Sequence, residues 1–389
     1  MRPFTFYILR STHRAARIIL IITCLYCGMS GKSFAETSFG RSPNTFRSTL
    51  IFQTWKLTPS EPEAVEERLS QVALPIFGKL ALSPNMWLYV SQSNATMRFD
   101  AGEVDDSLSG VGDAKLKFAY EFPEGRVRLT TGVSVPTGKN LLSPLEVDIA
   151  NQFYSEVLGF PVNRLGEGVD LHLAAAATQP IASLVFSGGV SHLHKGSYDV
   201  MEGAPHYEPG NQFQAAVGAR WDGNRIAWQS NLTYTRYGAD RFDDQIWFEQ
   251  GDEMRIESTV RWVGRVTQFE LMHREFLRGK NHFRTTADEL SAEFFNTNGN
   301  RREIALWGGY KTSPIVQIHG GAEYQSTRAN EKDEGESTVW QFTIGVDFQM
   351  TDRIKAQMAG RFATGEMRDG AVDLRGLGAW FGISSGFGG

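Results

Sequence analysis

Four charged side chains share one strand parity in an apolar segment of the sequence, with Ala119 as the one uncharged residue between them. Asp113, Lys115, Lys117 and Glu121 alternate with five apolar residues, Ala114, Leu116, Phe118, Tyr120 and Phe122. Successive side chains of a β-strand point to opposite faces, so this spacing gathers carboxylates and amines on one face. Acidic and basic groups arranged in this way can form ion pairs or line a polar path for a solute.

The histidines are the residues to test first for catalysis, because a histidine with a serine and an acid can form a hydrolytic set. His192 and His194 share the parity of the apolar Phe186, so both are expected to point outward. His172 and His319 are expected to point inward, yet no serine and acid stand at a recognisable nucleophile and base spacing from them. We predict that the protein is not an enzyme and keep a lipid-modifying hydrolase as the last alternative.

Metal and cofactor sites are not predicted. Acidic residues cluster at 103–106, 240–244 and 331–336, but none of these segments has the spacing of a defined calcium loop. Solvated loop charge explains them, with divalent bridges to lipid headgroups as a lesser alternative. The glycine-containing stretches GRVRLTTG and GAWFG lack the following helix that phosphate binding requires, so we read their glycines as packing sites.

The alternation of apolar and polar residues extends from about Phe46 to Phe387. It is clearest from Thr338 to Phe348, a segment longer than the usual strand of a soluble protein and long enough to cross a bilayer when tilted. Short turns and longer polar connections separate such segments in turn, as in outer-membrane barrels with short periplasmic turns and longer extracellular loops. We predict an all-β fold, a transmembrane antiparallel β-barrel of about 16 strands, with 14 to 18 compatible with the pattern.

The N-terminal residues have the features of a secretory signal. Four arginines precede an apolar stretch from Ile18 to Met29, and Ser33-Phe34-Ala35 forms a small-x-small cleavage site. We therefore expect a signal peptide at 1–35, a short segment at 36–45 and the barrel at 46–389. Both cysteines lie in the predicted signal, so the mature chain has no thiol for a disulfide or a metal site.

The charge balance excludes one class of partner. The chain has 39 Lys and Arg against 44 Asp and Glu, and five of the basic residues but no acidic residue lie in the predicted signal. The mature chain therefore has 34 basic against 44 acidic residues, a net charge of about −10. A nucleic-acid partner is not expected, since its signature is a basic patch.

Many charged residues are assigned to the lumen, because an Arg or Lys that faces lipid near the midplane costs about 2–4 kcal/mol. Strand parity places the following candidates for a solute path inside: Asp113, Lys115, Lys117, Glu121, Arg128, His172, Arg255, Glu257, Arg261, Glu270, Arg274, Glu303, Lys311, His319 and Arg361. Such residues can cross-link the barrel or take part in solute passage, and the two roles are compatible.

One long connection, from Lys139 to Gly168, is unusually apolar and has the composition of a short amphipathic helix. Loops of this length without structure are uncommon, and an apolar one should bury itself. It either folds into the mouth of the barrel or covers it. We expect a constriction or a hydrophobic capture site made by Leu142, Leu145, Ile149, Phe153 and Leu158.

Two motifs carry a family resemblance. Residues 109–116 read SGVGDAKL, and residues 132–140 read GVSVPTGKN. The chain here resembles the outer-membrane protein family of the MetA pathway of phenol degradation, whose members have a similar Gly-x-Gly-Asp strand opening and an apolar-Pro-Thr-Gly-Lys strand end. The resemblance implies an outer-membrane barrel that passes hydrophobic or aromatic compounds, and it implies no catalytic residues.

These observations predict a barrel for passive uptake of small, hydrophobic or aromatic solutes in the bacterial outer membrane. The expected partners are the solute, outer-membrane lipid and lipopolysaccharide, and the barrel-assembly machinery. Two alternatives stay open from the sequence. One is a general water-filled porin, and the other is a closed barrel with a structural or adhesive role.

Overall fold

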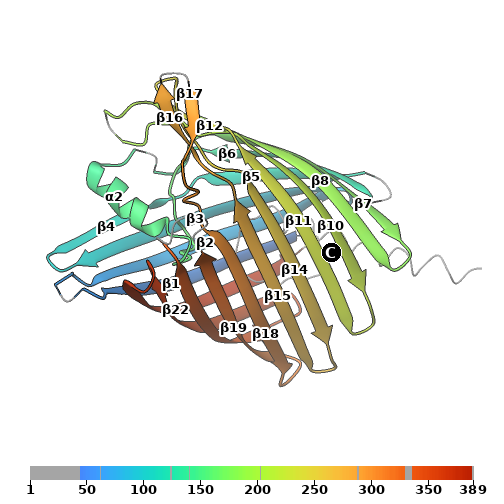
Figure 1. Ribbon diagram of the computed structural model, residues 1–389. Helices are drawn as coiled ribbons and strands as arrows, with labels where there is room; N and C mark the ends of the chain where they lie inside the picture. Colours follow the sequence, from blue (N-terminus) through green and yellow to red (C-terminus); the bar gives the residue numbers. More distant parts are fainter. Residues whose placement is uncertain are drawn as a thin grey trace, which may run out of the picture.

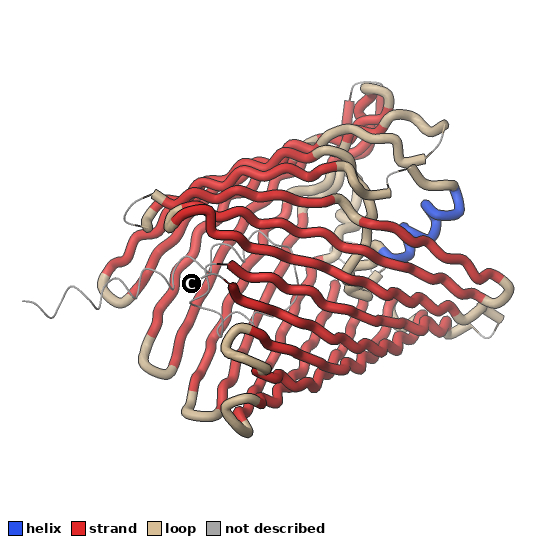
Figure 2. The backbone as a smooth tube through the Cα atoms, turned by 180° about the vertical axis from the view of Figure 1, so that it is seen from behind, coloured by secondary structure: helices blue, strands red, loops and turns tan. Residues whose placement is uncertain are grey.

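The computed structural model describes residues 44–387, apart from 62, 123–124, 140, 202, 287–288 and 329–334. The predicted signal peptide at 1–35 and most of the segment at 36–45 lie outside this part of the chain. The described chain folds into one large antiparallel sheet that curls into a barrel, with loops and a helix gathered at one end (Figures 1 and 2).

The strands of the large sheet follow one another around the barrel, each paired with its neighbours. Their bounds are β1 (Asn44–Pro59), β2 (Glu67–Ser83), β3 (Met86–Ala101), β4 (Val104–Val111), β5 (Ala114–Glu121), β6 (Val127–Val135), β7 (Asp170–Ile181), β8 (Leu184–Lys195), β10 (Gln212–Asp222), β11 (Ile226–Tyr237), β14 (Glu253–Val263), β15 (Thr267–Arg278), β18 (Asn300–Lys311), β19 (Val316–Arg328), β20 (Ser337–Gln349), β21 (Ile354–Met367) and β22 (Val372–Phe387).

The first and last strands close the barrel. β1 pairs with β22 along its whole length, from Asn44 opposite Phe387 to Pro59 opposite Val372. The sheet contains 17 strand segments, but β4 and β5 pair with successive parts of β3 and share one position in the wall. The described chain is therefore a closed antiparallel barrel of 16 strands, which confirms the predicted fold class.

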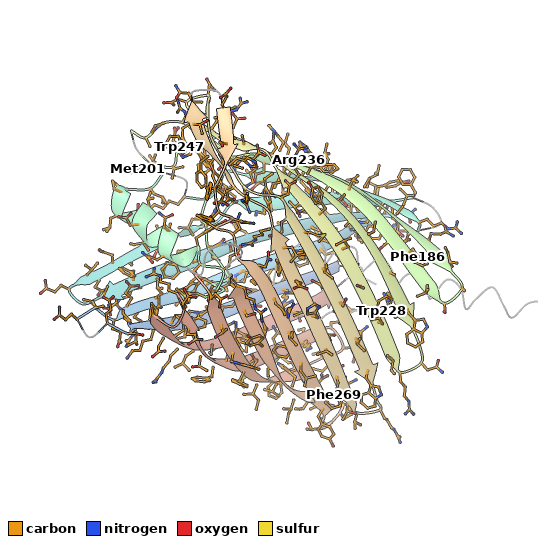
Figure 3. All side chains as sticks on the ribbon, in the orientation of Figure 1. Phe186, Met201, Trp228, Arg236, Trp247 and Phe269 are labelled. Atoms are coloured by element: carbon orange, nitrogen blue, oxygen red, sulfur yellow. The ribbon has the colours of Figure 1, made fainter. Side chains whose placement is uncertain are left out.

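The two faces of the wall differ in chemistry. Large apolar side chains on the outer face are more than half exposed, among them Leu173, Val217, Leu306, Ile344 and Leu377. Figure 3 shows Phe186, Trp228 and Phe269 on this surface, near the ends of the strands that short turns connect. An apolar belt around a closed barrel is the surface that lipid solvates, and closure leaves no unpaired backbone in the bilayer.

Among the described residues, no helix is long and apolar enough to cross a membrane.

The two ends of the barrel also differ. At the turn end, β-strands are joined by short connections such as 84–85 and 182–183. At the loop end, three long connections contribute strands to a second, five-stranded sheet that lies above the barrel (Figure 1). Its strands are β9 (Tyr207–Glu208), β12 (Ala239–Phe242), β13 (Gln245–Glu249), β16 (His282–Thr286) and β17 (Glu289–Ala292).

Two segments keep strand pairing although one is polar and the other contains a proline. Residues 100–111 are not a polar loop, because β3 and β4 continue as a hairpin with Arg98 bonded to Asp105. Polar residues extend the outer face of this hairpin beyond the lipid, while Met97 and Leu108 on its inner face are buried. Pro75 forms no bulge, since β1 and β2 keep one register from Ser48 opposite Ile76 to Ile51 opposite Ala73.

A candidate solute path and the loop that narrows it

The apolar connection between β6 and β7 contains the helix α2 (Pro144–Phe153). Ser143 caps its first turn in a capping box with Glu146, and Pro144 occupies a position where a missing backbone N–H costs nothing. Lys139 forms an ion pair with Glu146 and ties the helix start to the preceding chain. These local signals set where the helix begins, and the predicted amphipathic helix is confirmed.

Apolar side chains of this connection dock against inward-facing side chains of the barrel wall. Phe153 is fully buried, and its ring lies 4.5 Å from that of Phe160, centroid to centroid. The barrel contributes the other half of this cluster from β1–β4 and β20–β22: Trp55, Leu57, Leu69, Ala73, Ala95, Met97, Leu108, Val339, Ala363, Val372 and Leu374. The connection therefore folds against the inner wall.

Hydrogen bonds fix the loop in register with the wall. The side chains of Gln53 and Trp55 donate to the carbonyl oxygen of Leu158 at 2.7 and 2.8 Å. Gln71 bonds both backbone groups of Val162, donating to its carbonyl oxygen and accepting from its N–H. Buried backbone groups need such partners because they are shielded from water. Inward glutamines on β1 and β2 thus make the hydrogen bonds that water would otherwise make to the loop backbone.

The other side of the loop is held by an ion-pair latch, which we define as Glu156 with Arg278 and Arg301. Arg278 reaches both carboxylate oxygens of Glu156, at 2.8 and 2.9 Å, and Arg301 reaches one at 2.6 Å. Arg301 also stacks on Phe276 with 4.0 Å to the ring centre. Burial acts to raise the pKa of Glu156, but attraction to Arg301 and Arg278 outweighs it, so this pKa lies below 4.5.

The two sequence motifs meet at the base of the loop. Asp113 accepts hydrogen bonds from the backbone N–H groups of Gly138 at 2.8 Å and of Glu167 at 2.7 Å. A Cβ atom at Gly138 would lie 2.2 Å from the carbonyl oxygen of Leu165, so only glycine fits. Asp113 stands where β4 ends and β5 begins. The two motifs therefore join both ends of the loop to the break between β4 and β5.

The five loop residues predicted to act together do not share one environment. Ile149, Phe153 and Leu158 are buried in the cluster against the wall. Leu142 packs against the edge of this cluster and bridges to Met201. Leu145 lies one turn before Ile149 on the same stripe of α2, but it is half exposed in the first turn and takes no part in the packing.

The predicted lumen residues fall into three groups on the inner wall. The first group, on β5 to β7 and the β4–β5 break, is Asp113, Lys115, Lys117, Glu121, Arg128 and His172. Arg128 donates to the hydroxyl of Tyr89 at 2.8 Å and stacks on Trp87. Lys117 and His172 flank Gly132 in register. Lys115 is exposed to the lumen. This group is a polar patch, and within it Asp113 is the residue that binds the backbone of the loop.

The second group forms cross-strand charge ladders on β14, β15 and β18, and its members are Arg255, Glu257, Arg261, Glu270, Arg274, Glu303 and Lys311. Arg274 stands directly opposite Glu257 and Glu303 and bonds them at 2.8 and 3.2 Å. Arg261 stands opposite Glu270, four residues nearer the turn end on β15. Lys311 is exposed at the turn end. Opposite charges in register stabilise this wall.

The third group consists of His319 and Arg361. His319 Nδ1 lies 3.8 Å from a carboxylate oxygen of Asp347, whose other oxygen accepts from Lys355 Nζ at 2.9 Å. Arg361 donates to the side-chain oxygen of Gln341 at 2.9 Å. The structure does not bring these residues to the loop or to the charge ladders.

Open space remains along the wall opposite the docked loop. A shallow pocket lies against β7–β14, where the inward side chains are mostly small. Its lining includes Ala176, Ser187, Gly189, Gln214, Ala216, Asn231, Thr233 and Arg255. The loop and this wall of small residues bound the candidate solute path.

Sequence reasoning missed the inward apolar residues and the latch. Trp55 and Leu57 share strand parity with Gln53, and this mixed parity near one strand end was the available signal for a covered patch. Arg278 is 122 positions from Glu156 and Arg301 is 145 positions from it, so no local pattern connects them.

No protein-family model matches the chain, and no curated protein is similar to it in sequence. Among solved structures, the toluene transporter TodX of P. putida superposes with a TM-score of 0.46 at 10% identity, covering 90% of this chain and 92% of TodX. The monoaromatic hydrocarbon channel CymD gives 0.43 at 9% identity, covering 90% and 89%. A loop-deletion mutant of the Vibrio cholerae outer-membrane protein OmpT gives 0.41 at 12% identity, covering 87% and 99%. Likeness at this level transfers no activity.

Proposed function

We propose that the protein is a passive outer-membrane channel for small solutes, with hydrophobic or aromatic compounds favoured, and that it has no enzymatic activity. The observation that carries the proposal is the apolar loop docked inside one half of the barrel while the opposite wall stays open. A protein that only needed a closed wall would gain nothing from a passage of small side chains beside a fixed constriction.

Solute capture is assigned to the loop end. Leu145 and Tyr154 are each about half exposed there, while the same loop buries Ile149 and Phe153 against the wall. Exposed apolar groups beside an opening provide a first contact for a hydrophobic solute, since contact removes the apolar surface of both from water. From there the solute passes between the loop and the wall of small residues.

The inward charges have a compatible second role. The ladder of Glu257, Arg274 and Glu303 cross-links three strands, and Arg255 borders the open space. We assign the ladder to wall rigidity and Arg255 to contact with the passing solute. Because the ladder side chains are held in ion pairs along the wall, they stay out of the proposed solute path.

The setting of the channel follows from the same proposal. The predicted signal would direct export, the barrel-assembly machinery would insert the chain, and the loop end would face outward into a leaflet of lipopolysaccharide. We also propose membership of the MetA-pathway outer-membrane family, supported by the way its two motifs join the loop to the strand break.

The test is conductance in a planar bilayer before and after deletion of residues 142–160, with and without a hydrophobic aromatic solute. We expect discrete channels that the solute blocks, and a larger conductance with weaker block after the deletion. Unchanged conductance and block in the deletion variant would contradict the role of the loop. Conductance without discrimination by hydrophobicity would favour a general porin, and a folded barrel without current would favour the closed alternative.

A further inference from the structure

Three basic residues stand side by side on the outer face of the barrel, across the closing seam. Lys56 of β1 is directly opposite Arg375 of β22 on one side and Arg68 of β2 on the other. Opposite positions on neighbouring strands place Cβ atoms about 4.5–5.5 Å apart. We call this set, Arg375, Lys56 and Arg68, the basic row.

The basic row faces away from the lumen. Each member alternates with buried inward residues, Leu374, Trp55 and Leu69 respectively, and Arg375 and Arg68 are exposed. Thus all three side chains share the outer surface with the apolar belt.

The row lies just above that belt. On β22 the outward positions from Phe387 to Leu377 include Ile383 and Phe381, and Arg375 comes next toward the loop end. Ten residues of strand tilted by about 40° rise about 25 Å, which is the height of the apolar band of membrane barrels. Arg375 is therefore at the level of the lipid headgroups.

The chain itself neutralises the row only in part. Lys56 pairs with Glu66 at 2.6 Å. Within the described residues Arg68 and Arg375 have no ion pair or side-chain hydrogen bond, although Asp100 stands opposite Arg68. Like charges directly opposite each other in a sheet are destabilising. The row therefore has an electrostatic cost that an external anion would remove.

Another outward arginine is satisfied by the chain. Arg302 of β18 stands opposite Glu275 of β15 and bonds it at 2.9 Å. The next outward residues above the row, Asp373 and Glu366, are acidic, so the unpaired positive charge is confined to one level. This contrast identifies the row as the unusual feature of this surface.

We propose that the basic row binds the phosphate groups of an outer-leaflet lipid. Guanidinium groups bind phosphate oxygens in pairs, and two of them flanking an ammonium fit an anionic headgroup. The inference rests on the outer-membrane setting proposed above and not on solute passage.

The experiment uses the full mature chain, refolded in zwitterionic detergent, and measures lipid binding by native mass spectrometry. The probes are diphosphorylated lipid A, the same glycolipid without phosphates, and inorganic phosphate. The test variant is Lys56→Gln/Arg68→Gln/Arg375→Gln, and the matched control is Arg302→Gln. Heat-modifiable electrophoretic mobility establishes that each variant folds, with Arg68→Gln and Arg375→Gln alone as replacements if the triple variant does not.

We expect the natural chain to bind the phosphorylated glycolipid at least about tenfold more tightly than the dephosphorylated one. The triple variant should lose this difference, Arg302→Gln should keep it, and millimolar phosphate should not displace the lipid. Equal binding of both glycolipids by the natural chain, or an unchanged preference in the triple variant, would overturn the proposal, as would full displacement by free phosphate. Conductance should be the same in the triple variant, which separates this site from the channel proposal.

Discussion

Two parts of the inner wall differ in chemistry although both face the interior of the same barrel. On β1–β4 and β20–β22, inward residues such as Trp55 and Leu69 are apolar and lie beneath the docked loop. On β7–β11, inward residues such as Ala216 and Thr233 are small and border open space. Inward polarity therefore follows what covers the wall and not the strand pattern alone.

The comparison also separates two kinds of stabilisation. The covered wall relies on burial of apolar surface and on hydrogen bonds from Gln53 and Gln71 to the loop backbone. The wall of β14, β15 and β18 relies on cross-strand pairs such as Arg274 with Glu257. The loop bridges the two, because the latch joins it to β15 and β18.

The largest effect is expected from Phe153→Ala, which breaks the covered wall. Phe153 is fully buried, and truncation of such a side chain costs about 3–5 kcal/mol. Here the lost free energy weakens the docking of the loop against the wall. Limited proteolysis should cut the loop faster, and conductance should rise with more noise. Leu141→Ala is the control, since Leu141 is half exposed. Equal protease resistance in Phe153→Ala would mean that the loop is not held by this cluster.

The open wall is tested by Ala216→Trp, which puts a large side chain into the proposed path. Single-channel conductance should fall severalfold because the passage is bounded by the fixed loop. The control is Leu232→Trp on β11, which places the same side chain on the lipid-facing surface and should leave conductance unchanged. Similar conductance in both variants would place the path elsewhere.

The barrel itself was largely readable from the sequence because lipid imposes a strict period of two. The alternation predicted about 16 strands between Phe46 and Phe387, and the structure closes a barrel of 16 strands over this range. The five-stranded sheet at the loop end was missed, since its pairings join different loops, as in Phe248 opposite Phe283. No local alternation marks strands of four or five residues whose partners are distant.

The candidate site was only partly readable. Strand parity identified inward charges such as Arg274 and Glu303. It cannot tell an apolar residue that faces a docked loop from one that faces lipid. Assigning apolar residues to lipid therefore overlooked Trp55 and its neighbours. The loop's apolar composition predicted both its burial and a short amphipathic helix, yet the partners on the wall depend on closure of the whole barrel.

A smaller effect is expected from Glu156→Gln, which weakens the latch between the loop and the charged wall. The carboxylate is partly exposed, with 46% of its side-chain surface accessible, so screening limits its contribution to about 1 kcal/mol or less. Docking should persist through the apolar cluster, while brief opening events in the single-channel record become more frequent. Glu63→Gln, an exposed loop carboxylate, is the control. A gating record identical to that of the natural chain would show that the cluster alone fixes the loop.

The smallest effect is the pH dependence of the latch. The pKa of Glu156 is lowered in the folded chain, so its contribution is fully present above the ordinary value of 4.5 and is lost as the pH falls through the folded-state value. Opening events should thus be constant from neutral pH down to the ordinary pKa of 4.5 and increase only below it. Glu156→Gln should show no such acid-induced rise, because it cannot lose a charge there. If the rise persists in Glu156→Gln, another acidic group controls the loop at low pH, and the latch is not the link between the two walls.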